Sequence, residues 1–291
     1  MNHSLTKALQ CILDEATRAG QRIFLVGGVV RDRVLGLPVQ GNDYDLCLEG
    51  DALGFAEAIQ PLLQGSLKRY PNFRSATIST EHAHFDFVSA RTETYPHPGA
   101  LPVVTWATIE QDLPRRDFTI NAIAMTLGDF LSGAPQYIDV TGGLADLAKQ
   151  SVAIIHSQSF RDDPTRLFRA VRYATRLSFS LSESTKVACS EALAADVLCT
   201  ISTKRTITEL QKILDEPCWY AMLRALDGLA IRLPLFPQLQ FESLIEPLRS
   251  ASDRYTTLLQ LLCRELPRAQ AKKFLQELSL PRELRDQIVG A

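Results

Sequence analysis

The sequence lacks a long apolar run, and this absence excludes a helix that spans a membrane. Hydrophobic side chains make up 46% of its 291 residues and charged ones 22%, proportions typical of a globular protein. No apolar stretch approaches the ~18 residues of a membrane span. The first ten residues, MNHSLTKALQ, contain no secretory core. We therefore expect a cytoplasmic protein with no membrane partner.

Closely spaced cysteine pairs and a strong net charge are also missing. The six cysteines form no Cys-x-x-Cys motif, which favours reduced thiols over a disulfide framework. Lys and Arg number 31 against 33 Asp and Glu, so the formal net charge is −2. A nucleic-acid partner would therefore need positive charge that is concentrated locally.

The hydrophobic pattern changes near residue 140. Before this point strand-like segments alternate with helical ones, whereas after Gly142-Gly143 the pattern is helical. The sequence therefore predicts a domain of strands and helices followed by a helical arm. Proline-rich residues 91–105 are expected to form a long loop. The expected strands include 22–26, 43–48, 75–79 and 84–89, and the expected helices include 5–19, 51–63, 119–125, 164–177 and 204–214.

Two carboxylates lie on the expected strand at 43–48. Because side chains alternate along a strand, Asp43 and Asp45 point to the same face. They repel each other unless a cation lies between them, and Mg²⁺ binds a few carboxylates together with substrate phosphates. Asp86, on the expected strand at 84–89, is a candidate third carboxylate. The alternatives are a surface turn for the aspartate pair and a solvent-facing edge position for Asp86.

A glycine pair follows the first expected strand. Gly27 and Gly28 stand between that strand and a short helical segment that carries Arg31. Such a turn lets backbone N–H groups approach a phosphate, and a guanidinium adds further donors. The segment matches neither G-x-G-x-x-G nor G-x-x-x-x-G-K-[ST], so dinucleotide-binding and P-loop motifs are excluded. The structural alternative is a tight connection from strand to helix.

Two further arginines directly precede the expected helix at 119–125. Arg115 and Arg116 are suited to binding a polyphosphate or an RNA backbone. Asp117 can cap the helix and hold the two arginines at its start. A capped surface helix with solvated arginines is the alternative.

A second basic segment, residues 161–176, contains five arginines and two aspartates. Asp163 and Pro164 form an expected helix start. Like charges on one helix face are destabilising, so a phosphate or base edges would compensate them. A fixed pair of Asp163 and Arg166 would present an acceptor and donors, as the edge of a base does. Four of the arginines recur at steps of three and four and share one face: Arg166, Arg169, Arg172 and Arg176.

These residues together resemble the class II tRNA nucleotidyltransferases (CCA-adding enzymes) and bacterial poly(A) polymerases, of the polymerase-β nucleotidyltransferase superfamily. Seven blocks occur in the family's order and cover about two-thirds of the chain. They are LVGGVVRDRVLG (25–36), DYD (43–45), DFVSARTETY (86–95), DLPRRDFTINAIA (112–124), IDVTGGLADL (138–147), DDPTRLFRAVRYATRLSF (162–179) and ISTKRTITELQKIL (201–214).

The resemblance implies an α+β fold in three parts. A nucleotidyltransferase head with a mixed sheet is expected at 1–143, a helical neck at 144–214 and a short helical body at 215–291. Two Mg²⁺ ions are expected on Asp43 and Asp45 of the head.

The resemblance also assigns residues to the nucleotide. The neck is expected to recognise CTP or ATP, and Arg205 and Glu209 on a neck helix are expected to form an i,i+4 ion pair. The phosphates are expected against Gly27, Gly28, Arg31, Arg115 and Arg116. The base is expected against Asp163, Arg166, Arg169 and Arg172.

The activity that follows is template-independent addition of C, A or both to the 3′ end of tRNA. The RNA 3′-OH attacks the α-phosphate of CTP or ATP, and pyrophosphate leaves. Residues 91–108, with Arg91, Glu93 and Tyr95, favour an enzyme that adds A. An oligomeric state is not indicated.

Several other functions stay open at this point. Within the family, a CC-only enzyme, an A-only enzyme and a poly(A) polymerase share these motifs. A catalytically silent protein that binds nucleotide or RNA is an alternative of a different class. A metal-dependent phosphohydrolase would need an adjacent His-Asp pair, and none of the five histidines stands next to an aspartate.

Overall fold

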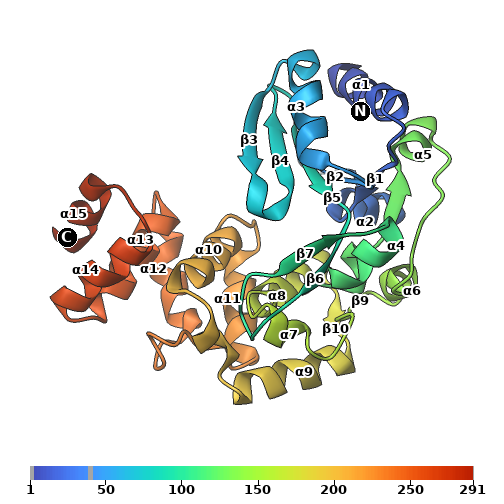
Figure 1. Ribbon diagram of the computed structural model, residues 1–291. Helices are drawn as coiled ribbons and strands as arrows, with labels where there is room; N and C mark the ends of the chain where they lie inside the picture. Colours follow the sequence, from blue (N-terminus) through green and yellow to red (C-terminus); the bar gives the residue numbers. More distant parts are fainter. Residues whose placement is uncertain (1–2, 39–41, 291) are drawn as a thin grey trace. The chain divides into compact units, whose positions relative to one another are not determined.

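The computed structural model describes residues 3–38 and 42–290 (Figure 1). The chain divides into two compact units. One consists of residues 1–96 and 102–155, and the other of 97–101 and 156–291. No helix within the described residues is both long and apolar enough to cross a bilayer.

A six-stranded mixed sheet organises the first unit. Its strand order is β3-β4-β5-β2-β1-β8. Only β2 and β5 run parallel among these neighbours, and the other pairs are antiparallel. The strands are β1 (Ile23–Val26), β2 (Asp43–Leu48), β3 (Ser66–Tyr70), β4 (Ser75–Ser79), β5 (His84–Ser89) and β8 (Ala124–Thr126).

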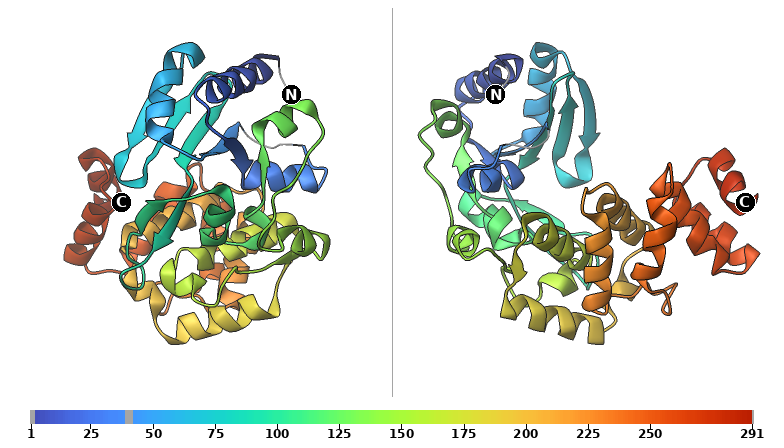
Figure 2. Two further views of the ribbon diagram at one scale, coloured as in Figure 1. Left: turned by 45° about the vertical axis from the view of Figure 1, so that its right-hand side comes forward. Right: turned by 180° about the vertical axis from the view of Figure 1, so that it is seen from behind.

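Helix α3 (Ala52–Leu63) covers one face of this sheet. It packs on β3, β4 and β5, and α1 (His3–Arg18) lies beside it (Figures 1 and 2). The ring centroids of Phe55 in α3 and Phe87 in β5 are 5.7 Å apart. Alternate residues of the central strands, such as Tyr44 and Phe85, are buried on this face. Burial of one face requires the alternating apolar pattern of these strands.

The opposite face of the sheet is covered over only part of its width. Over β1, β2 and β8 it carries a buried apolar cluster, whose members are Phe24, Val26, Cys47, Ala90, Ile109, Leu113, Ala122 and Ala124. Beyond this cluster, Asp43 and Asp45 of β2 are exposed and Asp86 of β5 is half-buried. The face therefore changes from apolar to acidic at the middle of the sheet.

Short elements complete the first unit. A hairpin, β6 (Arg91–Thr94) and β7 (Val103–Trp106), follows the sheet strand β5. The others are α2 (Gly28–Val34), α4 (Ile109–Asp112), α5 (Leu127–Ser132), α6 (Gly143–Ala148), β9 (Ser151–Val152) and short 3₁₀ turns at 71–73, 113–115 and 119–121.

Helices dominate the second unit. Their buried residues, including Leu210, Met222, Leu259 and Phe274, form its core. The helices are α7 (Ser159–Asp162), α8 (Arg166–Leu177), α9 (Glu183–Ala194), α10 (Thr203–Leu214), α11 (Trp219–Gly228), α12 (Ile245–Arg249), α13 (Arg254–Arg264), α14 (Arg268–Glu277) and α15 (Arg282–Gly290). The remaining elements are β10 (Ser180–Leu181) and 3₁₀ turns at 197–200 and 241–244.

The structure confirms the predicted α+β fold and the strands at 43–48, 75–79 and 84–89. The helix predicted at 119–125 is wrong. The segment begins with a 3₁₀ turn at 119–121 and its last two residues belong to β8. Met125 pairs with Leu25 of β1, and this tertiary pairing overrides the local apolar pattern. The long loop predicted at 91–105 is also wrong, since this segment contains the β6–β7 hairpin.

The first unit continues beyond the head boundary predicted at residue 143. Helix α6 packs against the 3₁₀ turn at 119–121. A Cβ on Gly143 would lie only 2.2 Å from the carbonyl oxygen of Thr119. The absence of a side chain at Gly143 therefore allows α6 to approach the 119–121 turn this closely.

Candidate active site

Three carboxylates meet on the exposed half of the sheet. Asp43 and Asp45 flank Tyr44, which is 2% exposed, so both aspartates project from the other face of β2. The parallel register of β2 and β5 places Asp45 beside Asp86. The Thr77 hydroxyl of β4 donates a hydrogen bond to Asp86, which ties that carboxylate into the sheet. The structure thus brings together the three aspartates that the sequence singled out.

These carboxylates suit a hard cation that also binds substrate oxygens. Oxygen donors are the ligands of Mg²⁺, which in nucleotide enzymes binds one or two carboxylates and phosphates. Within the described ranges, no group of three or more His, Cys, Asp or Glu side chains is arranged to hold a metal by itself. The exposed pair Asp43 and Asp45 therefore fits a site that substrate completes, and Asp86 is engaged with Thr77.

The turn after β1 lies against this acidic face. Gly27 has φ +72°, and a Cβ there would lie 3.0 Å from Oδ2 of Asp45. The backbone angle favours glycine, and the absence of a Cβ leaves room for the Asp45 carboxylate. The turn that opens α2 is therefore held directly beside the Asp45 carboxylate.

Arg31 in α2 is buried rather than presented at the surface. It is 3% exposed, pairs with Asp32 at 2.7 Å and donates to Oδ1 of Asn121 at 2.8 Å. Nδ2 of Asn121 donates to Asp117, which also accepts from the backbone N–H of Phe118 at 2.8 Å. Asp117 therefore does not cap a long helix as predicted. It anchors a polar chain that fixes α2 against the 119–121 turn.

Arg115 and Arg116 share one buried carboxylate. Asp112 is 0% exposed, and its two oxygens lie 2.7 Å from Nη2 of Arg115 and 2.7 Å from Nη2 of Arg116. Arg115 also lies 3.1 Å from Glu93 of β6. The two arginines are thus held in place by carboxylates of the same unit.

The ionisation states of Asp112, Arg115 and Arg116 depend on one another. Burial disfavours the ionised form of Asp112, but Arg116 and Arg115 outweigh burial and lower its pKa. Burial also disfavours the cation of Arg116, and Asp112, Cys47 and Asp45 outweigh it and raise its pKa. Arg116 therefore carries its positive charge between Asp112 and the candidate metal ligand Asp45. Sequence reasoning missed Asp112, although its i,i+3 and i,i+4 spacing to the arginines indicates such a pairing.

In the second unit, Asp163 begins the turn of residues 164 and 165 that leads into α8, whose first residue is Arg166. Its carboxylate accepts from the backbone N–H of Thr165 at 3.0 Å, and its backbone is extended, as at a helix cap. The same carboxylate also accepts from Nη2 of Arg205 at 2.8 Å, which links the start of α8 to α10.

The arginines of α8 gather around one aromatic ring. The guanidinium carbons of Arg169, Arg172 and Arg176 lie 5.5, 5.5 and 5.8 Å from the Tyr173 ring centroid. Cations over an aromatic face are stabilised by its quadrupole. Tyr173 therefore compensates part of the like-charge repulsion that the sequence assigned to an external ligand.

The two most buried arginines of α8 differ in how completely they are paired. Arg166 is 5% exposed and donates to the Ser159 hydroxyl at 2.8 Å. Nη2 of Arg172 lies 3.9 Å from Glu209, and its buried Nε has no acceptor in the described part of the chain. The Nε–H group of Arg172 is thus a donor that no acceptor in the described part of the chain uses.

The predicted ion pair between Arg205 and Glu209 is wrong. Arg205 instead pairs with Asp163 and donates to the carbonyl of Gly99 at 2.9 Å. Glu209 lies 2.6 Å from Lys212 and faces Arg172. The long arginine side chain reaches partners outside its own helix, which i,i+4 spacing alone does not reveal.

The predicted site residues therefore fall into two groups. The carboxylates, the glycine turn, Arg31, Arg115 and Arg116 belong to the first unit. Asp163 and the α8 arginines belong to the second. Each group is held by hydrogen bonds and ion pairs within its own unit.

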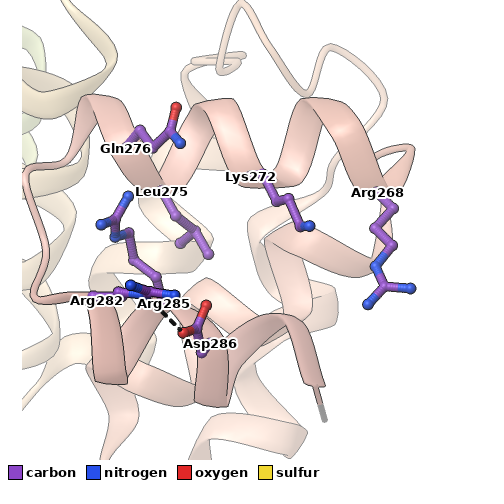
Figure 3. A pocket seen from close by; sticks show the side chains of 7 residues that line it. All are labelled: Arg268, Lys272, Leu275, Gln276, Arg282, Arg285 and Asp286. Atoms are coloured by element: carbon purple, nitrogen blue, oxygen red, sulfur yellow. Dashed lines mark ion pairs between the residues drawn. The ribbon is translucent and has the colours of Figure 1, made fainter.

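A separate basic pocket of about 430 Å³ lies between α14 and α15. Lys272 and Arg268 extend from α14 toward α15 (Figure 3). Arg282 lies 3.6 Å from Asp286, and the buried Nε of Arg285 has no acceptor among the described residues. The pocket is lined by Arg268, Lys272, Leu275, Gln276, Arg282, Arg285 and Asp286. Four basic side chains against one acidic chain make it suited to an anion.

Two family models match this chain. The one described as Poly A polymerase head domain covers residues 23–153. The one described as Probable RNA and SrmB-binding site of polymerase A covers residues 178–242. The first match coincides with the sheet and its carboxylates, and the second lies within the helical unit.

The sequence of this chain is also similar to those of known tRNA nucleotidyltransferases. An A-adding tRNA nucleotidyltransferase of Halalkalibacterium halodurans is 40% identical over 224 residues, which are 74% of this chain and 51% of the relative. A CC-adding tRNA nucleotidyltransferase of Deinococcus radiodurans is 37% identical over 220 residues, covering 74% of this chain and 56% of the relative. The chain thus spans about half the length of these relatives.

A solved structure extends the likeness to the fold. The apo form II of a CCA-adding enzyme superposes with a TM-score of 0.80 at 29% identity, covering 99% of this chain and 70% of that one. Both units of the present chain are therefore represented in that structure.

Proposed function

The chain belongs to the family of class II tRNA nucleotidyltransferases and poly(A) polymerases, and on this basis we propose that it adds C, A or both from CTP or ATP to the 3′ end of tRNA. The observation that carries the proposal is the acidic face of the sheet, where Asp43, Asp45 and Asp86 lie together beside the Gly27 turn. Chance would rarely place this turn and these carboxylates side by side.

The proposed roles in the head follow from the positions of its side chains. Asp43 and Asp45 would hold Mg²⁺, with Asp86 beside them. Bound Mg²⁺ would lower the pKa of the attacking 3′-OH and neutralise charge on the triphosphate. The backbone N–H groups of Gly27 and Gly28 would donate to the phosphates.

The arginines of the head support this arrangement in different ways. Arg116, whose charge is stabilised by Asp112, would offset negative charge beside Asp45. Arg115 is held by Asp112 and Glu93 and would act next to it. Arg31 would position α2, and with it the glycine turn, through Asn121.

We infer that the helical unit selects the base. Arg205 fixes the Asp163 carboxylate and Ser159 fixes Arg166, so an acceptor and a set of donors are oriented before the nucleotide binds. Such a pair can match the hydrogen-bonding edge of cytosine or adenine. Arg169 and Arg172 stand on the same helix to contact the nucleotide.

For the finer specificity, we propose an enzyme that adds A, alone or after CC. The support is the β6–β7 segment, where Arg91 lies 2.7 Å from Glu93 and Tyr95 donates to Glu93. The similarity to an A-adding relative agrees with this proposal.

Incubation with labelled CTP and ATP separately tests the function and its specificity. The acceptors are tRNAs that end in the discriminator base, in C or in CC, with Mg²⁺ present. We expect ATP to label the tRNA ending in CC. Incorporation from CTP alone indicates a CC-only enzyme, and a ladder of several A residues indicates a poly(A) polymerase. No incorporation on any acceptor contradicts the proposal and favours a silent binding protein.

We further infer that the α14–α15 pocket binds the phosphate backbone of tRNA. Replacing Lys272 by glutamine should lower the tRNA affinity several-fold and reduce the slope of log affinity against log salt by about 1. Fluorescence anisotropy with labelled tRNA measures both. Lys273→Gln removes the same charge from the same helix outside the pocket lining. Equal losses in both variants would contradict binding in the pocket.

A further inference from the structure

The acidic face of the sheet continues beyond the carboxylates to a cation and an aromatic ring. Four adjacent strands place Asp45, Asp86, Thr77 and Lys68 in one cross-strand row. Neighbouring strands lie about 4.8 Å apart, so the backbones of Asp45 and Lys68 are separated by about 14 Å. The row thus runs from the candidate metal ligands to the edge strand β3.

Lys68 and Tyr70 project from the same side of β3. Residues two apart on a strand share a face, and Nζ of Lys68 lies 5.2 Å from the Tyr70 ring centroid. Lys68 is exposed and Tyr70 is half-buried. No carboxylate forms an ion pair with Lys68 in the described part of the chain. The pair therefore offers a positive charge and a ring to a ligand on the open face.

Arg69, which lies between Lys68 and Tyr70 on β3, points to the other face of the sheet. There its Nε lies 2.6 Å from Oε1 of Glu57 in α3. Strand β3 thus places one cation on each face of the sheet. Of these two cations of β3, Lys68 is the one that shares a face with Asp45.

We propose that Lys68 and Tyr70 bind the single-stranded 3′ segment of the RNA as it approaches Asp43 and Asp45. Lys68 contacts a backbone phosphate, and Tyr70 stacks against a base. This inference rests on the proposed function and assigns a path for its RNA substrate across the sheet.

The chemistry of the face favours RNA at this position over the incoming nucleotide. Nζ of Lys68 lies over the Tyr70 ring of its own strand, three strands from Asp45, so it faces a ligand at the edge strand rather than a phosphate held at Asp45. An acidic face repels an RNA backbone, so the approaching strand needs a cation nearby. Single-stranded ends have unstacked bases, which proteins hold on aromatic side chains beside basic groups.

Steady-state kinetics separate RNA binding from chemistry. Lys68→Gln and Tyr70→Ala are each expected to raise the KM for tRNA about tenfold while kcat and the KM for the nucleotide stay unchanged. Lys68→Arg and Tyr70→Phe should retain most of the tRNA affinity. Arg69→Gln, which alters the neighbouring cation on the other face, should leave the KM for tRNA unchanged.

A fluorescence signature tests stacking without turnover. 2-Aminopurine placed near the 3′ end of tRNA should be quenched on binding, and Tyr70→Ala should remove this quenching whereas Tyr70→Phe retains it. Because the readout needs no incorporation, it separates failure of this inference from failure of the proposed function. An unchanged KM for tRNA in both variants, or a rise in the nucleotide KM instead, would overturn the assignment.

Discussion

Replacing Asp43 or Asp45 by asparagine is expected to reduce nucleotide incorporation at least 10³-fold while the protein remains folded. In the proposed site, each substitution removes a negative oxygen that would bind Mg²⁺, and the electrostatic contribution of such an ion to phosphoryl transfer amounts to several kcal/mol. Asp43 is exposed, and exposed substitutions usually change stability by less than about 0.5 kcal/mol. Loss of activity therefore need not reflect loss of the fold.

Single-turnover incorporation of labelled nucleotide, with thermal melting of the same preparations, checks this expectation. A melting temperature near that of the parent protein shows that the sheet is intact. Asp51→Asn provides a matched control, because Asp51 is an exposed aspartate of the same unit, at the start of α3. Activity within a few-fold of the parent in Asp43→Asn and Asp45→Asn would contradict the proposed metal site.

Replacing Asp112 by asparagine is expected to destabilise the first unit strongly. The substitution removes the negative charge that both Arg115 and Arg116 share in a fully buried position. Removing one partner of a buried ion pair costs about 3–5 kcal/mol, because the remaining charge is left uncompensated. The melting temperature should fall by about 6 °C or more, given roughly 2–4 °C per kcal/mol for a unit of this size.

The same carboxylate predicts a direction for acid sensitivity. Its pKa is lower in the folded protein than the usual ~3.9 of the unfolded chain. The contribution of ionised Asp112 to stability is therefore fully present above about pH 4. It is lost as the pH falls through the lower pKa that Asp112 has in the folded protein. Urea unfolding between pH 3 and pH 7 should show this loss in the parent protein.

The Asp112→Asn variant should be less stable at pH 7 and should lose less stability on acidification. Asp129→Asn is a control, because Asp129 is a half-buried aspartate of the same unit that accepts a hydrogen bond from Thr126 at the start of α5. Among the described residues, Asp129 forms no buried ion pair with an arginine. A difference below about 1 kcal/mol between Asp112→Asn and the parent at pH 7 would contradict the importance of this buried carboxylate.

The parts of the fold that could be predicted from sequence are those set by strict alternation. At the start of β2 (DYDL) and of β5 (HFDF), apolar residues alternate with polar ones. This alternation fixes both the strand and the face of each carboxylate. Strand β3, with the sequence SLKRY, has no such apolar alternation, so nothing local marks it. The 119–125 segment is apolar on both sides, and only its pairing with β1 decides that it contributes a strand.

The residues of the candidate site could also be predicted only in part from the sequence. The charged groups themselves stand out, and the structure places Asp43, Asp45 and Asp86 together as expected. Their partners do not stand out, because Asp112, Tyr173 and Ser159 acquire roles only through tertiary contacts. The arginines consequently looked unpaired in the sequence, whereas much of their charge is balanced inside the protein.

The single parallel pairing in the sheet has a consequence for the order of folding. Antiparallel β3, β4 and β5 can form as successive hairpins, whereas joining β2 to β5 closes a segment of about 40 residues. Contacts between residues far apart in the sequence form slowly, because closing the loop between them costs conformational entropy before the contacts themselves can stabilise the chain. We expect Asp45 and Asp86 to meet only when this closure is complete. The repulsion between the two carboxylates is thus imposed late, on a sheet that is already largely assembled.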